Sequence, residues 1–99
     1  MKNDIETIIA EFNNCATKIY SVLSDEFLES VRHIDRNGEE NVFKMQEAKF
    51  MTALKYQLDE QVKKILETAD SKIHTPLEAE LSARISYYLQ EFQLKCNAL

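Results

Sequence analysis

The stretch HIDRNGEEN, residues 33–41, contains the only glycine of the 99-residue chain and is dense in oxygen-bearing side chains. In an EF-hand calcium loop, glycine takes the sixth of twelve positions and a bidentate glutamate the twelfth. With Gly38 at position six, the twelfth position falls on Lys44, which repels a cation. With Asp35 placed first, Glu40 takes position six and the glycine is lost. We therefore interpret the stretch as a turn between two helices, where Gly38 can end the first helix in the left-handed conformation.

The remaining candidates for metal binding or nucleophilic chemistry are His33, His74, Cys15 and Cys96. A di-iron bundle needs Glu-x-x-His spacing, and serines occupy both of those glutamate positions. In an up-down-up bundle the two histidines lie at opposite ends, so we interpret them as solvated side chains at helix ends. The two cysteines would be separated by roughly 13 Å along parallel helices, whereas a disulfide needs alpha carbons within about 7 Å. We expect two buried free thiols.

The sequence contains no pattern for phosphate binding or acyl transfer. One glycine cannot form a glycine-rich phosphate loop, and there is no nucleophile elbow. The carboxylates are plentiful but fall on the polar faces of the expected helices, as solvation predicts. We therefore expect a protein that is not an enzyme and that binds no metal and no cofactor.

The net charge and the composition argue against further classes of protein. The net charge is −5, which argues against a protein whose main task is to neutralise phosphates. The chain is 44% hydrophobic, but it has no run of about 18 apolar residues, so we expect no membrane span. The first residues are acidic too early for a signal peptide. These features favour a cytoplasmic location.

Apolar residues recur at spacings of three and four along the first third of the chain, which predicts one face of a helix over residues 4–35. The series is Ile5, Ile8, Ile9, Phe12, Ala16, Ile19, Leu23, Phe27, Val31 and Ile34. Ser24 is followed by two acidic residues, a combination that suits the start of a helix. The sequence therefore predicts either one long helix or two helices that meet near Ser24.

Two further helices are expected over residues 39–72 and 76–97. The second carries Phe43, Phe50, Leu54 and Leu58 on one face, and the third carries Leu77, Leu81, Ile85 and Phe92. The residues Thr-Pro-Leu-Glu at 75–78 have the pattern of a capping box that starts the third helix. Long helices joined by short loops run antiparallel to their neighbours. We therefore predict a single all-α domain, residues 1–99, folded as an up-down-up antiparallel bundle of three long helices, or of four if the first breaks near Ser24.

The second and third helices carry more apolar side chains than one bundle face requires. A set nearly opposite the main stripe comprises Val42, Met45, Ala53 and Tyr56 on the second helix and Ala83, Tyr87 and Leu94 on the third. Tyrosine and methionine are enriched at protein interfaces. Two alternatives remain: scattered exposed side chains are normal on monomers, or a kinked segment of residues 25–36 folds over Val42 and Met45.

These features predict a non-enzymatic protein-binding or regulatory protein of the small adaptor, inhibitor or chaperone type. Its partner would be a second copy, forming a homodimer, or another protein. The alternative is a nucleic-acid-associated helical protein. That alternative is weaker because lysines and arginines are interleaved with acids and no recognition-helix pattern appears.

Overall fold

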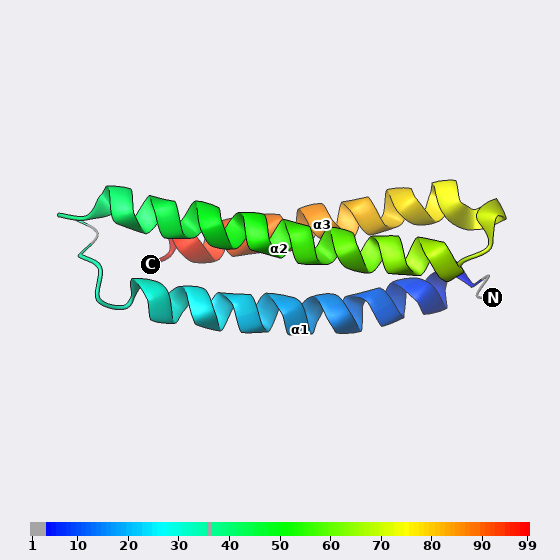
Figure 1. Ribbon diagram of the computed structural model, residues 1–99, viewed down its shortest axis with the longest axis horizontal. Coiled ribbons are helices and arrows are strands. Elements are labelled where there is room, and N and C mark those ends of the chain that lie inside the picture. The colour runs from blue at the N-terminus through cyan, green and yellow to red at the C-terminus, as the bar shows by residue number, and fades with distance from the viewer. Residues whose placement is uncertain (1–3, 36) are drawn as a thin grey trace.

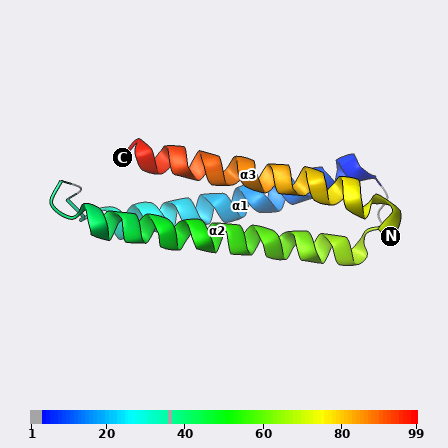
Figure 2. The ribbon, with the colours of Figure 1, turned by 90° about the horizontal axis from the view of Figure 1, so that it is seen from above.

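The computed structural model describes residues 4–35 and 37–99, and it confirms the all-α bundle. The elements are α1 (Ile5–Val31), α2 (Glu40–Thr68), a short 3-10 turn η1 (Ser71–Ile73) and α3 (His74–Asn97). Helices α1 and α3 run in the same direction and α2 runs against both (Figures 1 and 2). The molecule is a rod, 53 Å long with a cross-section of 19 × 18 Å between alpha carbons.

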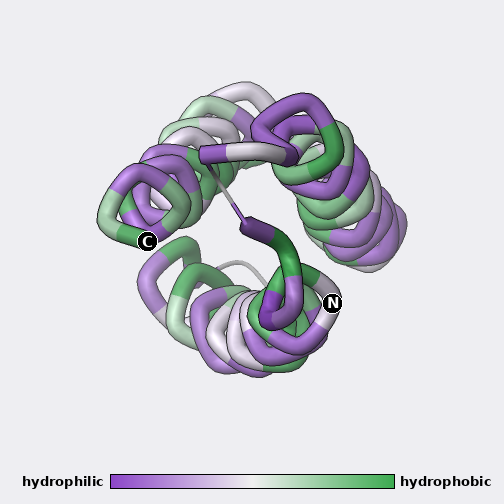
Figure 3. Tube along the Cα trace, turned by 90° about the vertical axis from the view of Figure 1, so that its left-hand side faces the viewer, coloured by the Kyte–Doolittle hydropathy of each residue, from purple (hydrophilic) through white to green (hydrophobic). Residues whose placement is uncertain are grey.

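The bundle has one core along its whole length, and the three helices surround it (Figure 3). An aromatic cluster lies in the core toward the end of the bundle where α1 ends and α2 begins: the ring of Phe27 meets the rings of Phe43, Phe50 and Phe92 in edge-to-face contacts, with centroids 5.2–5.7 Å apart. The remaining fully buried side chains come from all three helices; the largest are Phe12, Ile8, Leu54, Leu58, Leu77 and Leu81. The main apolar series predicted for each helix therefore does face the core.

Helix α1 begins with a local cap. The carboxylate of Asp4 accepts hydrogen bonds from the amides of Glu6 and Thr7, at 3.0 and 3.4 Å, and from the Thr7 hydroxyl at 2.8 Å. These bonds favour the charged carboxylate, and the Thr7 hydroxyl contributes most to lowering the pKa of Asp4 below its ordinary value. The helix therefore starts one residue later than predicted, with Asp4 as its cap.

Helix α1 is continuous through Ser24, so a break at this residue was the wrong alternative. Helix continuation keeps Leu23 and Phe27 in the core, and this burial outweighs the preference of serine for caps. The cost is local. The Ser24 side chain is 1% exposed, and its Oγ has no hydrogen-bond partner, although the Tyr20 hydroxyl lies near it.

We expect Ser24→Ala to stabilise the protein by about 1 kcal/mol, because an unpaired buried hydroxyl is unfavourable and alanine is the best helix former. For a domain of this size, that gain raises Tm by about 4–8 °C. Thermal unfolding followed by circular dichroism measures it. Ser21→Ala on the exposed side of α1 is the matched control, since it reports helix propensity alone. Equal gains at the two positions would show that the Ser24 hydroxyl carries no penalty.

The first loop differs from its prediction. No glycine or other residue in the described chain has a positive φ, so the left-handed conformation predicted for Gly38 is wrong. Asp35 organises the turn instead: its backbone carbonyl accepts from the amides of Gly38 and Glu39, at 3.1 and 2.6 Å, and its carboxylate accepts from the amide of Asn37 at 2.9 Å. Helix α1 therefore ends at Val31, four residues before the predicted end.

The second connection also differs. The capping box predicted at residues 75–78 does not form, because α3 already begins at His74 and Ile73 takes the cap position without a side-chain hydrogen bond. Asp70 provides the local cap one turn earlier, where its carboxylate accepts from the amide of Lys72 at 2.9 Å. Nε2 of His74 donates to the carbonyl of Ala69 at 3.1 Å, since a carbonyl can only accept. His74 is thus half-buried and structural rather than solvated.

Candidate protein-binding faces

The outer face of α2 carries three of the predicted interface residues. Met45 and Tyr56 are 69% and 64% exposed, and Val42 is 43% exposed. They lie on the opposite side of the helix from Leu54 and Leu58, which are fully buried. The described part of residues 25–36 leaves Val42 and Met45 uncovered, so the kinked-segment alternative is wrong; its last residue, Arg36, lies outside the described residues.

Ala53 has a different environment from the other residues predicted on α2. It is half-buried and packs against the core. The outer face of α2 also contains Lys49 and Lys63, which lie between or beyond its apolar residues. This face is therefore a mixed surface, in which Lys49 interrupts the apolar side chains and Lys63 lies beyond them.

The outer face of α3 carries the other predicted residues. Ala83 is exposed, and Tyr87 and Leu94 are 54% and 61% exposed. Tyr87 also packs edge-to-face on Tyr88, with ring centroids 5.4 Å apart. Three further apolar residues continue this face and are exposed: Pro76, Ala79 and Ala98. The sequence reasoning missed them, although their spacing of four, seven and eleven residues from the predicted ones is the same helical signal.

The predicted residues do not form one patch. The three helices stand around a common axis, so the outer faces of α2 and α3 point in different directions (Figure 3). A polar contact lies between the two helices, where Nε2 of Gln93 donates to Oε2 of Glu47 at 3.3 Å. The candidate interface is therefore two separate faces, and a single flat partner surface can cover only one of them.

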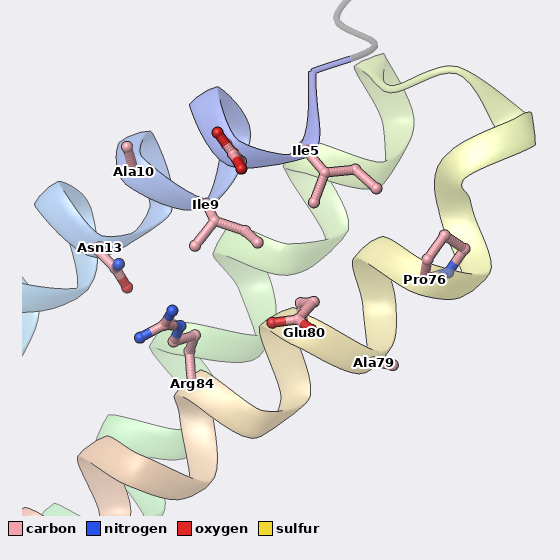
Figure 4. A pocket seen from close by; sticks show the side chains of 9 residues that line it. Ile5, Ile9, Ala10, Asn13, Pro76, Ala79, Glu80 and Arg84 are labelled. Atoms are coloured by element: carbon pink, nitrogen blue, oxygen red, sulfur yellow. The ribbon is translucent and has the colours of Figure 1, made fainter.

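A groove of about 670 Å³ opens between the first turns of α1 and α3, and the sequence reasoning did not find it. Ile5 and Ile9 of α1 point across it toward Pro76, Glu80 and Arg84 of α3 (Figure 4). Five of its nine lining residues are apolar, and Glu6, Glu80 and Arg84 also line it. Because Pro76 and Ala79 belong both to this groove and to the outer face of α3, the two surfaces are continuous.

The seam between α1 and α3 continues beyond the groove through Tyr20. Its ring lies 5.9 Å from that of Tyr88, and Nζ of Lys95 stands 5.2 Å above it. Burial raises the pKa of the Tyr20 hydroxyl above its ordinary value; the nearby Ser24 hydroxyl counteracts this in part, and the negative charge of Glu91 adds to it. Tyr20 therefore packs against the core in the seam between α1 and α3.

The candidates for metal or thiol chemistry lie apart. Cys96 is fully buried, as predicted, but Cys15 is exposed, so the expectation of two buried thiols was wrong for Cys15. A helical wheel places Cys15 off the centre of the apolar stripe, which the linear spacing obscured. Among residues 4–35 and 37–99, no three His, Cys, Asp or Glu side chains are grouped to hold a metal ion. No helix in that part of the chain is long and apolar enough to cross a membrane.

The function has to be inferred from the faces and the groove described above. The chain matches no protein-family model, and it shows no detectable similarity to a curated protein or to a solved structure.

Proposed function

We propose that this protein is a non-enzymatic protein-binding protein that acts through the outer faces of α2 and α3 and forms a homodimer. One observation carries the proposal: five large apolar side chains are exposed on the outer sides of two helices whose inner sides already fill the core. They are Val42, Met45, Tyr56, Tyr87 and Leu94. Two helices that each expose such residues at helical spacing are typical of surfaces that bind other helices.

The chemistry of these faces favours a protein partner over a nucleic acid. Methionine and tyrosine are enriched at protein interfaces and offer large contact areas at low cost in conformational entropy. The net charge of −5 opposes approach to a polyanion. We therefore propose that this bundle acts as a small adaptor, inhibitor or chaperone.

Light scattering after size exclusion, across a dilution series, tests the proposal. We expect the mass of the wild type to rise toward that of a dimer with concentration. One double variant carries Met45→Lys with Tyr56→Glu, and the other carries Tyr87→Lys with Leu94→Glu, so neither changes the net charge. We expect at least one of them to remain monomeric while its thermal unfolding stays cooperative. A wild type that is monomeric at every concentration would contradict the homodimer.

A further inference from the structure

The outer face of α3 is the better suited of the two faces to bury against another protein. Its exposed stripe runs the length of the helix and comprises Pro76, Ala79, Ala83, Tyr87, Leu94 and Ala98. The one polar member is Gln90, and no charged residue interrupts the stripe. On α2, by contrast, Lys49 would have to lose its hydration if that face were covered, and an unpaired buried charge is costly.

Four charged residues flank this stripe on the side of α3 that faces α1. In chain order they are Glu80, Arg84, Glu91 and Lys95, so their charges alternate in sign along one margin. None of them forms an ion pair within the described part of the chain, although Lys95 stands above the Tyr20 ring. The opposite margin, formed by Ser82, Ser86 and Gln93, is uncharged.

The charged margins of two α3 helices are complementary only when the two helices run antiparallel. If a second α3 packs antiparallel on the stripe, the same margins of the two helices face each other. Glu80 then lies opposite the partner's Lys95, and Arg84 lies opposite the partner's Glu91. Along the sequence, the midpoint of positions 80 and 95 and that of positions 84 and 91 both lie between Tyr87 and Tyr88. A single two-fold axis at this point therefore generates two copies of each ion pair. In a parallel pairing the charged margin would face the uncharged one, and no ion pair would form.

We propose that a second copy of this chain docks antiparallel on the outer face of α3, with the two-fold axis at Tyr87 and Tyr88. This inference rests on the proposed function and names the face and the geometry of the homodimer. The register places the partner's Leu94 level with Leu81, beside the apolar groove between α1 and α3. The groove thus gives an exposed leucine of the partner an apolar surface to cover.

The size of the stripe sets the expected affinity. From Pro76 to Ala98 it is about 33 Å long at 1.5 Å per residue, and a helix is about 10–12 Å wide, which gives roughly 350 Å² per chain in projection. The α1 residues of the groove add to this area. A standard stable interface buries about 800 Å² per partner. We therefore expect a dimer that dissociates in the micromolar range.

The alternating charges permit a pair of complementary variants. Arg84→Glu leaves three acids on the margin, and the two at positions 84 and 91 would each meet an acid of the partner. Glu91→Arg leaves two arginines that would likewise repel. We expect each variant alone to dimerise roughly tenfold more weakly than the wild type, or worse, because symmetry repeats every repulsion twice. An equimolar mixture of the two should restore association to at least the wild-type level.

Sedimentation velocity from low micromolar to near-millimolar concentration measures all of these species. The matched controls are Lys18→Glu and Glu26→Arg on exposed positions of α1, which change the net charge by the same amounts and should leave the dimer intact. Circular dichroism confirms folding of each variant. The inference is overturned if the two α3 variants dimerise like the wild type, if mixing them restores nothing, or if the wild type stays monomeric. A dimer that responds to Met45→Lys with Tyr56→Glu but not to Arg84→Glu would overturn this geometry and support the proposed function.

Discussion

Replacing Phe27 with alanine is expected to lower the free energy of unfolding by about 3–5 kcal/mol. Phe27 is fully buried, and its ring touches Phe43 and Phe50 of α2 and Phe92 of α3, so it joins all three helices at one level of the bundle. The three partner rings come from two other helices and cannot all move inward to fill the space. A cavity therefore remains, and its cost adds to the lost burial.

Urea unfolding followed by circular dichroism measures this effect. The loss is a large share of the about 5–15 kcal/mol that stabilises a small domain, so the variant is expected to be partly unfolded at 37 °C. Tyr56→Ala is the matched control, since it removes an aromatic ring from an exposed position outside the dimer face inferred on α3 and should change stability by less than about 1 kcal/mol. Similar losses at Phe27 and Tyr56 would show that Phe27 does not join the three helices in the core.

Leu58→Lys is expected to abolish the folded state. Leu58 lies near the middle of α2 and is fully buried. A lysine there would place an ammonium group in an apolar core that offers it no carboxylate. Such a substitution belongs to the class that costs more than about 4 kcal/mol. We expect the variant to show no cooperative thermal transition by circular dichroism at neutral pH.

A lysine at a nearby exposed position of α2 is the control for Leu58→Lys. Tyr56 is 64% exposed, two residues before Leu58 and on the other side of α2. Tyr56→Lys introduces the same charge, yet it should change the free energy of unfolding by no more than about 0.5 kcal/mol, because lysine is solvated there and is the better helix former. Loss of the folded state in Tyr56→Lys would mean that the outer face of α2 is part of the core.

The helices could be predicted because their signal is local. Side chains at spacings of three and four fall on one side of any α-helix, so residues such as Phe12, Leu54 and Phe92 are identified as core without knowledge of the fold. The same reasoning identified the surplus residues Met45 and Tyr87, which are exposed on the outer faces. Whether these faces bind a partner remains a prediction for the experiments above.

The ends of the helices could not be predicted, because they depend on competition between hydrogen-bond partners. Thr75 has the residue pattern of a cap, but α3 begins at His74, two residues earlier than predicted, and the His74 ring donates to the carbonyl of Ala69. At the other end of the bundle, the carboxylate and carbonyl of Asp35 form the turn that Gly38 was expected to make. Several residues in each loop can satisfy the same backbone groups, and local propensity does not rank them.

The sequence by itself determined three helices, one shared core and a surplus of apolar side chains, because helical periodicity is a property of each segment alone. Only the tertiary structure decided how these segments relate. It placed the surplus residues on two faces that point in different directions, left Ala53 half-buried and formed the groove beside Pro76. These features depend on the relative rotation and register of the helices. Rotation and register are set by how side chains from different helices fill the space between them, which no single helix encodes.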